Sequence, residues 1–427
     1  MKPAARIQSS IELMDEILKG IKPADTLIAD YFKIRRYAGS KDRRAVNTQI
    51  YNILRNRAKL GWLAQKTDLE PNAENLVFMD CVLNDMDVND LFNGEQYAPA
   101  KLTKEQVEAL PVLAQLDLAS APDPIRLEYP DWMDNELRIS LGDDFETCLQ
   151  ALNAEAPLDL RINSLHPDHD KAQDLLNKQN IDTTTTDFSP LCLRSAKKVK
   201  LGGVQAYKDG IVDIQDEGSQ LIALLSGAKG CDLVMDFCAG AGGKTLALGA
   251  EMANKGHLYA LDISSKRLYK MRRRLERAGV TNVILHPIQN ETDPWLKQFE
   301  NRVDRLLIDA PCSGVGAWRR SPESRWKMTP ELLADLEGRQ QRILQNAAHL
   351  VKIGGRMIYA TCSLLKRENE DQIERFLNEN KNFKLLPISQ VWAETLTTPC
   401  PFEGDFMSMR PDQHQSDGFF CAVLERL

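Results

Sequence analysis

Two cysteines lie in short polar segments, each directly after an apolar run. They are found in Pro311-Cys312-Ser313 and in Thr361-Cys362-Ser363. A lone cysteine is usually a small buried apolar side chain, which suits Cys81, Cys148 and Cys231. Two cysteines at the ends of neighbouring strands indicate chemistry instead, because a thiolate can act there as a nucleophile. No pair of histidines at ligand spacing accompanies them, so we expect no metal site.

The chemistry that needs such a thiolate is alkylation of a pyrimidine at carbon 5, an atom too electron-poor to attack a methyl donor directly. Addition of the thiolate at carbon 6 makes carbon 5 nucleophilic. An acid near ring nitrogen 3 stabilises this adduct, and Asp309 is placed for that role. A base must then remove the proton from carbon 5 before the enzyme can leave. Because the target base has to leave its stack, we expect a single-stranded or flipped nucleotide.

A glycine-rich segment from Cys238 to Thr245 follows another apolar run. It is not a P-loop, because Cys238 occupies the place of the first glycine, and it is not a dinucleotide fingerprint, because Thr245 occupies that of the last. Its glycines let the backbone approach a ligand closely, and the helix that follows favours an anionic group at its N-terminus. Asp262, 22 residues after Gly240, suits a ribose diol. S-adenosylmethionine offers a carboxylate and a ribose without a phosphate, and is the expected cofactor.

Alternating strands and helices must position these side chains, and they predict an open parallel sheet in residues 208–427. Apolar runs predict strands at 233–237, 257–261, 283–286, 305–308 and 357–361. A helix is predicted from Pro330 to Val351, with Gly354-Gly355 as its stop signal. Ligands of such sheets bind beyond the carboxyl ends of the strands. We therefore expect one crevice to hold the side chains at these ends, which are Asp236, Asp262, Asp309 and Cys362.

Two further regions precede this sheet. Residues 1–127 read almost entirely as helix, because apolar residues recur at helical spacing, and Asp42 is a candidate cap for one helix. Residues 128–207 read as a small α/β unit with a strand at 158–162 and a helix at 168–179. The predicted domains are therefore 1–127, 128–207 and 208–427.

The composition is that of a globular protein, with 427 residues, 43% hydrophobic and 27% charged. No apolar run approaches the ~20 residues of a membrane-spanning helix, so we expect no membrane association. Nine cysteines without a Cys-x-x-Cys motif indicate reduced thiols in the cytoplasm. The net charge of −7 is unevenly distributed, since residues 1–70 carry +6, residues 71–150 carry −13 and the remainder is balanced.

Positive charge gathers in three clusters, which favour a nucleic-acid partner despite the acidic total. The clusters are Lys33, Arg35, Arg36, Lys41, Arg43 and Arg44; Lys266, Arg267, Lys270, Arg272, Arg273, Arg274 and Arg277; and Arg319, Arg320, Arg325 and Lys327 with Trp318 and Trp326. The second cluster is explained equally well as the solvated face of one helix. The third places aromatic residues among cations, which predicts contact with a strand whose bases are splayed out.

The catalytic half resembles the Sun-type RNA cytosine-5 methyltransferases. The resemblance rests on Gln215-Asp216-Glu217-Gly218-Ser219, the loop 238–245, Asp262, the segment 309–314 with 319–323, Tyr359-Ala360-Thr361-Cys362-Ser363 and Asp417-Gly418-Phe419-Phe420. The N-terminal helices, with Ser40-Lys41-Asp42-Arg43-Arg44, look like the NusB-like RNA-binding domain of bacterial members that act on 16S rRNA. The resemblance implies a Rossmann-like class I methyltransferase domain, preceded by an all-α NusB-like domain and a small α/β RNA-binding unit.

The resemblance also implies residue roles. Cys362 would be the nucleophile and Cys312 would assist product release, whereas DNA cytosine methyltransferases use a Pro-Cys nucleophile, so this assignment does not follow from spacing. Lys244 and Asp309 would complete the catalytic set. Contacts to S-adenosylmethionine transfer to Cys238, Ala239, Gly240, Ala241, Gly242, Gly243, Lys244, Asp262 and Asp309.

Two positions depart from the family pattern. Ala241 stands where the family usually has proline, which should change the stiffness of the loop more than its chemistry. Asn290 aligns with an acid that contacts the adenine side of the cofactor, and its amide can still hydrogen-bond adenine.

The activity that the resemblance implies is formation of 5-methylcytosine in 16S rRNA before the small subunit is fully assembled, by a monomer. A non-catalytic RNA-binding or ribosome-assembly module on the same fold is the alternative, and the presence of both cysteines with Asp309 speaks against it. A dinucleotide-dependent oxidoreductase is disfavoured by Thr245 and by the two cysteines.

Overall fold

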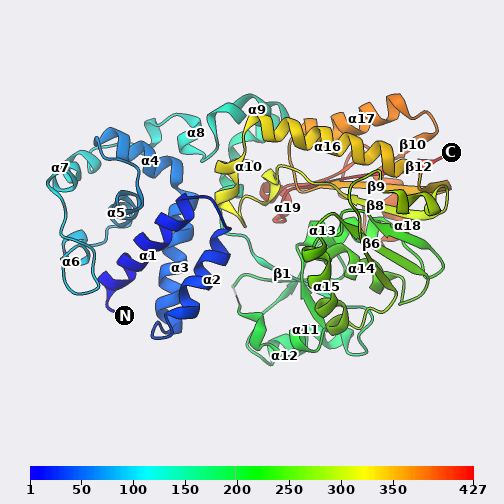
Figure 1. Cartoon of the computed structure of the whole chain (residues 1–427), viewed down its shortest axis with the longest axis horizontal. Coiled ribbons are helices and arrows are strands. Elements are labelled where there is room, and N and C mark those ends of the chain that lie inside the picture. Colours follow the sequence, from blue (N-terminus) through cyan, green and yellow to red (C-terminus); the bar gives the residue numbers. More distant parts are fainter. Residues whose placement is uncertain (198) are drawn as a thin grey trace. The chain divides into compact units, whose positions relative to one another are not determined.

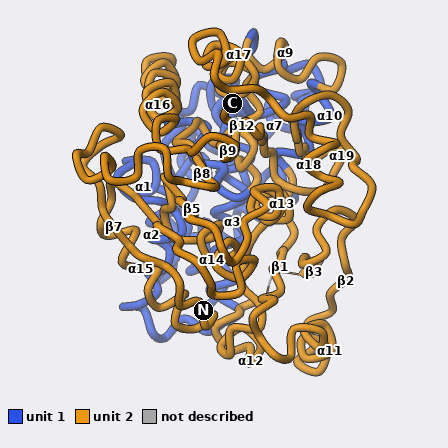
Figure 2. The backbone as a smooth tube through the Cα atoms, turned by 90° about the vertical axis from the view of Figure 1, so that its right-hand side faces the viewer, with its two compact units in different colours: residues 1–135, 145–153, 320–328 blue, residues 136–144, 154–319, 329–427 orange. Residues whose placement is uncertain are grey.

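The computed structural model describes residues 1–197 and 199–427 (Figure 1). The chain forms two compact units (Figure 2). Unit 1 comprises residues 1–135, 145–153 and 320–328, and unit 2 comprises residues 136–144, 154–319 and 329–427.

Unit 1 is built from helices, as the sequence predicts. They are α1 (Pro3–Leu18), α2 (Ala24–Ile34), α3 (Ser40–Arg55), α4 (Arg57–Lys66), α5 (Ala73–Leu83), α6 (Val88–Leu91), α7 (Lys104–Leu113), α8 (Asp123–Arg126) and α10 (Phe145–Asn153). The apolar stripes of α1 and α3, which include Met14, Ile17, Val46 and Ile50, are buried in one core.

Asp42 caps α3 from inside the helix rather than from in front of it. Its carboxylate accepts a hydrogen bond from the backbone N–H of Gly39 at 3.1 Å. The same carboxylate pairs with Arg6 at 2.9 Å and with the N-terminal ammonium of Met1 at 3.1 Å. It therefore joins the start of α1 to the start of α3.

Unit 2 contains a small antiparallel sheet in the order β2-β3-β1-β4. Its strands are β1 (Leu158–Ile162), β2 (Thr184–Thr185), β3 (Cys192–Ser195) and β4 (Val212–Ile214), with the helices α11 (Ala172–Asn177) and α12 (Gln205–Lys208) beside them. Leu160, Leu176, Leu193 and Val212 share its core. The strand β4 also belongs to this sheet, although the predicted region ended at residue 207. The sequence did not indicate this strand, because three residues are too few to show an alternating pattern.

The large sheet of unit 2 is open and mostly parallel, in the order β10-β12-β9-β8-β5-β6-β7, with β11 paired to β12. Its strands are β5 (Leu233–Asp236), β6 (His257–Asp262), β7 (Val283–Pro287), β8 (Val303–Asp309), β9 (Val351–Thr361), β10 (Phe383–Leu386), β11 (Met407–Met409) and β12 (Phe419–Arg426). The parallel pairs join β7, β6, β5, β8 and β9, whereas β12 runs antiparallel to β9. The strand order reverses at β5, and a ligand crevice is expected there.

Helices cover both faces of this sheet. They are α13 (Glu217–Leu225), α14 (Gly243–Glu251), α15 (Ser265–Ala278), α16 (Pro330–Ala348), α17 (Glu370–Glu379) and α18 (Ile388–Thr395). Two further short helices are α9 (Asp134–Leu141) and α19 (Pro411–His414). On β9, Met357 and Tyr359 pack in the core with α16 and α17, and Ile358 and Ala360 pack in the core with α13 and α14. Successive strand residues point to opposite faces, so the second half of this strand, from Met357 to Ala360, is apolar on both faces.

The prediction for the glycine pair after α16 is wrong. The helix ends at Ala348, and Gly354-Gly355 lie inside β9 instead of terminating the helix. Gly354 has φ of +72°, and a Cβ on Gly355 would lie 2.9 Å from the carbonyl oxygen of Val303. Both glycines accommodate an irregularity in the pairing of β9 with β8, which lies between Val303 and Arg305 of β8.

Among the described residues, no helix combines the length and the apolar character that crossing a bilayer requires.

Candidate active site

The side chains predicted at strand ends lie on four adjacent strands of the large sheet. Asp262 ends β6, Asp236 ends β5, Asp309 ends β8, and Cys362 follows β9. The backbone ladder continues just past these ends, with Ala310 N–H donating to the carbonyl of Ala360 at 2.8 Å. The structure therefore brings these four residues to one edge of the sheet.

The glycine-rich loop after β5 needs glycine at two positions. Gly240 has φ of +56° and Gly242 has φ of +87°. A Cβ on Gly240 would lie 2.6 Å from the Arg267 guanidinium, and one on Gly242 would lie 2.3 Å from the Met271 side chain. The loop thus packs directly on α15, with no room for larger residues.

Hydrogen bonds from two sides fasten this loop. The carboxylate of Asp262 accepts from the backbone N–H of Gly240 at 2.8 Å and of Ser264 at 2.7 Å. Ala239 N–H donates to the carbonyl of Leu261, and Arg274 donates to the carbonyl of Ala241 at 2.6 Å. Each Asp262 oxygen retains a second lone pair, which a ribose hydroxyl could use.

Asp236 adds a feature that the predicted cofactor contacts do not include. Its buried carboxylate accepts a hydrogen bond from the Thr245 hydroxyl at 2.6 Å, while its other oxygen, Oδ1, is buried without a hydrogen-bond partner. Burial raises the pKa of Asp236 to about 7. Asp236 could have been identified as a cofactor contact from the sequence, because it is an acid at the end of the strand that precedes the glycine-rich loop.

The start of α14 complements Asp236. The N-cap of α14 is Gly242, which provides no side-chain cap, so the positive end of this helix points at the same loop. A ligand with an ammonium and a carboxylate would satisfy the Asp236 oxygen and the helix N-terminus together. The methionine end of S-adenosylmethionine has both groups, so the residues present fit that cofactor. Gly243 begins the helix, and burial raises the pKa of the Cys238 thiol well above its usual range.

Lys244 and Asp309 form an ion pair of 2.8 Å, with Lys244 nearly buried and Asp309 about one-third exposed. Burial disfavours the ammonium, but the Asp309 carboxylate, the charge of Cys362 and that of Asp236 outweigh it, so the pKa of Lys244 is raised. Lys244 therefore carries a positive charge beside Cys362.

The two cysteine sulfurs meet at 3.4 Å, and both side chains are partly exposed. The hydrogen bond to Cys362, followed by burial, raises the pKa of Cys312 well above its usual value. Cys312 thus keeps its proton and can donate it toward the Cys362 sulfur.

Asn290 lies just beyond β7, where it forms a turn. Its side-chain oxygen accepts hydrogen bonds from the backbone N–H of Thr292 at 2.9 Å and from its hydroxyl at 2.7 Å. The strand before it is held by His286, whose ring stacks on Trp295 at 3.7 Å between centres. Trp295 in turn packs against Tyr259 and Phe299. The exposed Asn290 side chain keeps its amide N–H groups available, and its contact with adenine stays a prediction.

The interpretation of the third basic cluster as an RNA-contacting loop is wrong for its central members. Trp318 is 1% exposed, and Arg319 is buried in an ion pair with Asp417. Arg325 is buried within unit 1, where it donates to the carbonyl of Glu128 at 2.7 Å. Only Lys327 is an exposed cation in this cluster.

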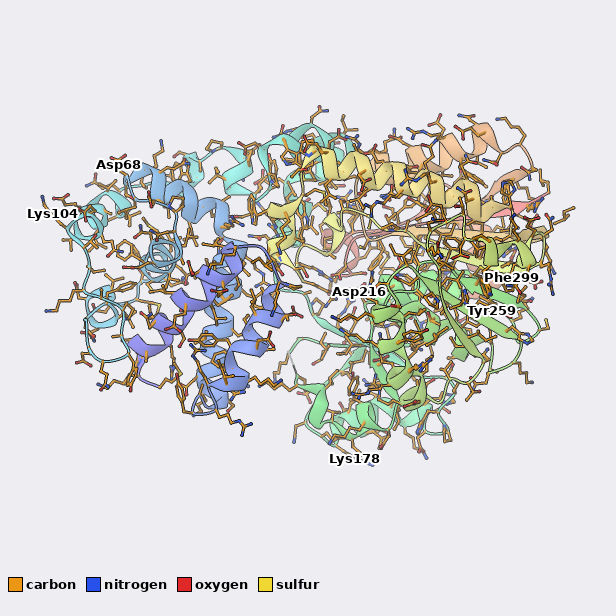
Figure 3. The ribbon with its side chains drawn as sticks, viewed as in Figure 1. Asp68, Lys104, Lys178, Asp216, Tyr259 and Phe299 are labelled. Atoms are coloured by element: carbon orange, nitrogen blue, oxygen red, sulfur yellow. The ribbon has the colours of Figure 1, made fainter. Side chains whose placement is uncertain are left out.

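Segments far apart in the chain hold the loop after Cys312. Gly316 N–H donates to the carbonyl of Cys362 at 3.0 Å, and Gly418 N–H donates to the carbonyl of Gly316 at 2.8 Å. Asp216, labelled in Figure 3, accepts from the hydroxyl of Ser416 at 2.7 Å and from the N–H of Asp417 at 3.1 Å. The two motifs that contain Asp216 and Gly418 therefore support the cysteine loop.

Comparison with known proteins agrees with this geometry. The family described as 16S rRNA methyltransferase RsmB/F matches residues 223–425, and its ferredoxin-like domain matches residues 129–201. A probable ribosomal RNA small subunit methyltransferase B from Synechocystis is 32% identical over 300 residues, which cover 70% of this chain and 67% of the relative. The chain belongs to the RsmB/F family. As a member, it is an S-adenosylmethionine-dependent rRNA methyltransferase.

Other relatives extend the comparison. The ribosomal RNA small subunit methyltransferase B of Pasteurella multocida is 32% identical over 302 residues, covering 70% of this chain and 65% of that protein. These matches span about two thirds of the relatives' length. The crystal structure of PH0851 covers 100% of this chain and 99% of its own, with a TM-score of 0.80 at 24% identity. The structure of NSun6 from Pyrococcus horikoshii with SFG covers 70% and 98%, with a TM-score of 0.62 at 19% identity. These two structures share the fold of this chain.

Proposed function

We propose that this RsmB/F protein forms 5-methylcytosine at one position of 16S rRNA, cytosine 967 in the usual numbering, and that Cys362 is the nucleophile. The proposal rests mainly on the two sulfurs at 3.4 Å, placed beside the Lys244–Asp309 pair and the loop that fits the cofactor. The RsmB relatives are named for small-subunit rRNA, which supports the substrate. The protein acts as a monomer on RNA that is not fully assembled.

The chain's own residues account for activation of the base. When bound, S-adenosylmethionine supplies an electrophilic methyl group. The Cys362 thiolate adds to carbon 6 of cytosine, and the electrons of the ring double bond become available at carbon 5. The Lys244–Asp309 pair offers one proton donor and one acceptor, which complement ring nitrogen 3 and the exocyclic amino group of cytosine.

Cys312 then serves in release of the product. Its raised pKa depends first on the hydrogen bond to Cys362. Once the Cys362 sulfur is bonded to carbon 6 it carries no charge, so that cause disappears and Cys312 ionises more readily. The Cys312 thiolate takes the proton from carbon 5, the carbon–sulfur bond breaks, and its electrons leave with Cys362 as the double bond re-forms.

Exposed cations on two surfaces support an RNA partner. Lys266, Lys270 and Arg273 lie on one face of α15, and none forms an ion pair within the described part of the chain. By contrast, Arg274 and Arg277 are both bound to Asp213 at 2.8 Å. The phosphates of a strand are the natural partners of such free cations.

The helical unit offers a second surface of this kind. Lys33, Arg36, Lys41 and Arg44 are exposed at the end of α2, in the turn after it and at the start of α3. Tyr37, which is 73% exposed, lies among them, and Tyr97 is 74% exposed. Both tyrosines line a groove of about 1220 Å³ within unit 1. Exposed aromatic rings beside cations suit unstacked bases.

The test is methyl transfer from labelled S-adenosylmethionine to protein-free 16S rRNA, followed by mapping of the modified base. We expect transfer by the wild type, none by Cys362→Ala, and a stalled covalent RNA adduct with Cys312→Ala. If Cys312→Ala were inactive without an adduct and Cys362→Ala trapped the RNA covalently, Cys312 would be the nucleophile and Cys362 the residue that assists product release. Modification at another nucleotide would refute the position proposed, and absence of transfer to any rRNA would refute the activity.

A further inference from the structure

A buried carboxylate lies against both cysteine loops. Glu368 ends a short 3-10 helix (Lys366–Glu368) just before α17, and its side chain is fully buried. It accepts hydrogen bonds from both the backbone N–H, at 2.8 Å, and the hydroxyl of Ser313. It also accepts from the hydroxyl of Ser363 and from the Gln340 amide at 3.0 Å.

The two serines follow the two cysteines directly. Ser313 is the residue after Cys312, and Ser363 is the residue after Cys362. Their hydroxyl oxygens lie 3.2 Å apart. Because the loops come from different strands, β8 and β9, no local turn sets the distance between them. The carboxylate of Glu368, which is hydrogen-bonded to both serines, sets this distance instead.

Neighbouring bonds hold Glu368 itself in place. Its backbone carbonyl accepts from the Tyr359 hydroxyl at 2.7 Å. Asn369 accepts from the Thr361 hydroxyl at 2.6 Å and donates to the carbonyl of Ser363 at 3.0 Å. The strand end before Cys362 and the residue after it are thus both fixed to the segment that carries Glu368.

The hydrogen bonds that Glu368 accepts favour a positioning role over a role in proton transfer. Oε1 of Glu368 accepts from two N–H groups, and Oε2 accepts from two hydroxyls. Two bonds to each oxygen occupy the lone pairs of an ionised carboxylate, so none is left to receive a proton from substrate. We infer that Glu368 is a positioning residue that sets the separation of the Cys312 and Cys362 sulfurs. Its effect on turnover rests on the proposed function, but its effect on the sulfurs does not.

Glu368→Gln is the variant that keeps the shape and removes the charge. An amide offers one oxygen and one NH₂ group in place of two oxygens, so either the two N–H donors face an NH₂ group or the two serine hydroxyls must accept hydrogen bonds instead of donating them. Two direct neighbours provide milder variants, Ser313→Ala and Ser363→Ala. Glu374→Gln is the matched control, because Glu374 is an exposed glutamate on the adjoining α17.

The decisive readout is the geometry of the thiols. Phenylarsine oxide bridges two close thiols and releases one water, and this binding needs neither RNA nor cofactor. We expect stoichiometric bridging of Cys312 and Cys362 in the wild type and in Glu374→Gln, located by mass spectrometry. In Glu368→Gln we expect at least a tenfold slower bridging reaction, with the affinity for S-adenosylhomocysteine unchanged.

Kinetics provide the second readout. We expect kcat of Glu368→Gln to fall about 100-fold with little change in KM, as for a small misplacement of reacting groups. The serine variants should each lower kcat, and their effects should not add to that of Glu368→Gln, because all three act through the same bonds. If Glu368→Gln does not fold, the two serine variants decide by the same measurements.

Wild-type bridging rates in Glu368→Gln and in both serine variants would overturn the inference. So would additive losses in kcat. If the wild type bridges the arsenical and Glu368→Gln does not, while no rRNA is methylated, the proposed function fails and the positioning role stands.

Discussion

The sulfur atoms of Cys312 and Cys362 lie 3.4 Å apart, although 50 residues separate them in the chain. At this distance the protonation of one thiol depends on the charge of the other. In the proposed mechanism, Cys312 therefore loses its proton only after Cys362 has bonded to the base.

The reactivity of Cys312 should depend on Cys362. The hydrogen bond to Cys362 is the main cause of the raised pKa of Cys312, so Cys362→Ala should move its alkylation by iodoacetamide to lower pH. In the wild type we expect Cys312 to react only above the pH at which a free thiol, with a pKa of about 8.5, reacts. Mass spectrometry of the alkylated cysteines across a pH series measures the reactivity of Cys312 in the wild type and in Cys362→Ala. Cys231 is the internal control, because it is exposed and not buried as its sequence context suggested. Equal profiles for Cys312 and Cys231 in the wild type would contradict the prediction.

Cofactor affinity should rise with pH up to about 7. The pKa of Asp236 is raised to about 7 by burial, so below that pH its carboxyl is mostly protonated. A cationic group at Oδ1 favours the carboxylate, and binding then releases a proton. Calorimetry of S-adenosylhomocysteine binding in buffers of different ionisation enthalpy measures that release. Asp236→Asn should abolish the pH dependence; an affinity that is constant through this range in the wild type would exclude Asp236 as the cause.

Gly316→Ala should impair turnover more than cofactor binding. A Cβ at Gly316 would lie 2.2 Å from the carbonyl oxygen of Gly418, so the loop that carries Cys312 must move. We expect a loss of about 1–3 kcal/mol in the free energy of unfolding and a fall of about 100-fold in kcat. Gly338→Ala within α16 is the control, since its Cβ would meet no atom closer than 3.5 Å and alanine favours a helix. Full activity in Gly316→Ala would show that this close approach is dispensable.

The exposed face of α15 should contribute to RNA affinity. Replacing Lys266, Lys270 and Arg273 with alanine should raise KM for rRNA, leave kcat nearly unchanged and reduce the salt dependence of binding by about three charges. Filter binding at several salt concentrations measures this dependence. The control replaces Lys297 and Lys381, which are also exposed and form no ion pair among the described residues. An equal loss of RNA affinity in the control would indicate that the overall charge of the protein, and not the face of α15, determines RNA binding.

Local patterns in the sequence were sufficient to locate the strand ends and the side chains that follow them. Apolar runs mark the ends of buried strands, so Asp309, Cys362 and the loop after Asp236 could be assigned to one edge of a parallel sheet. The glycines of that loop also follow from local geometry, because left-handed backbone at Gly240 and Gly242 excludes most other residues. The mostly parallel sheet and the N-terminal helices were predicted correctly for the same reason.

Only the tertiary structure decided how the charged and polar side chains are used. Arg319 and Arg325 have the same local composition as RNA-binding residues, yet each is bound to a group far along the chain, at Asp417 and at Glu128. Glu368 gave no sequence signal, because its partner Ser313 is 55 residues away. A charge is free or paired according to what the fold places beside it, and periodicity along the chain carries no record of such distant partners.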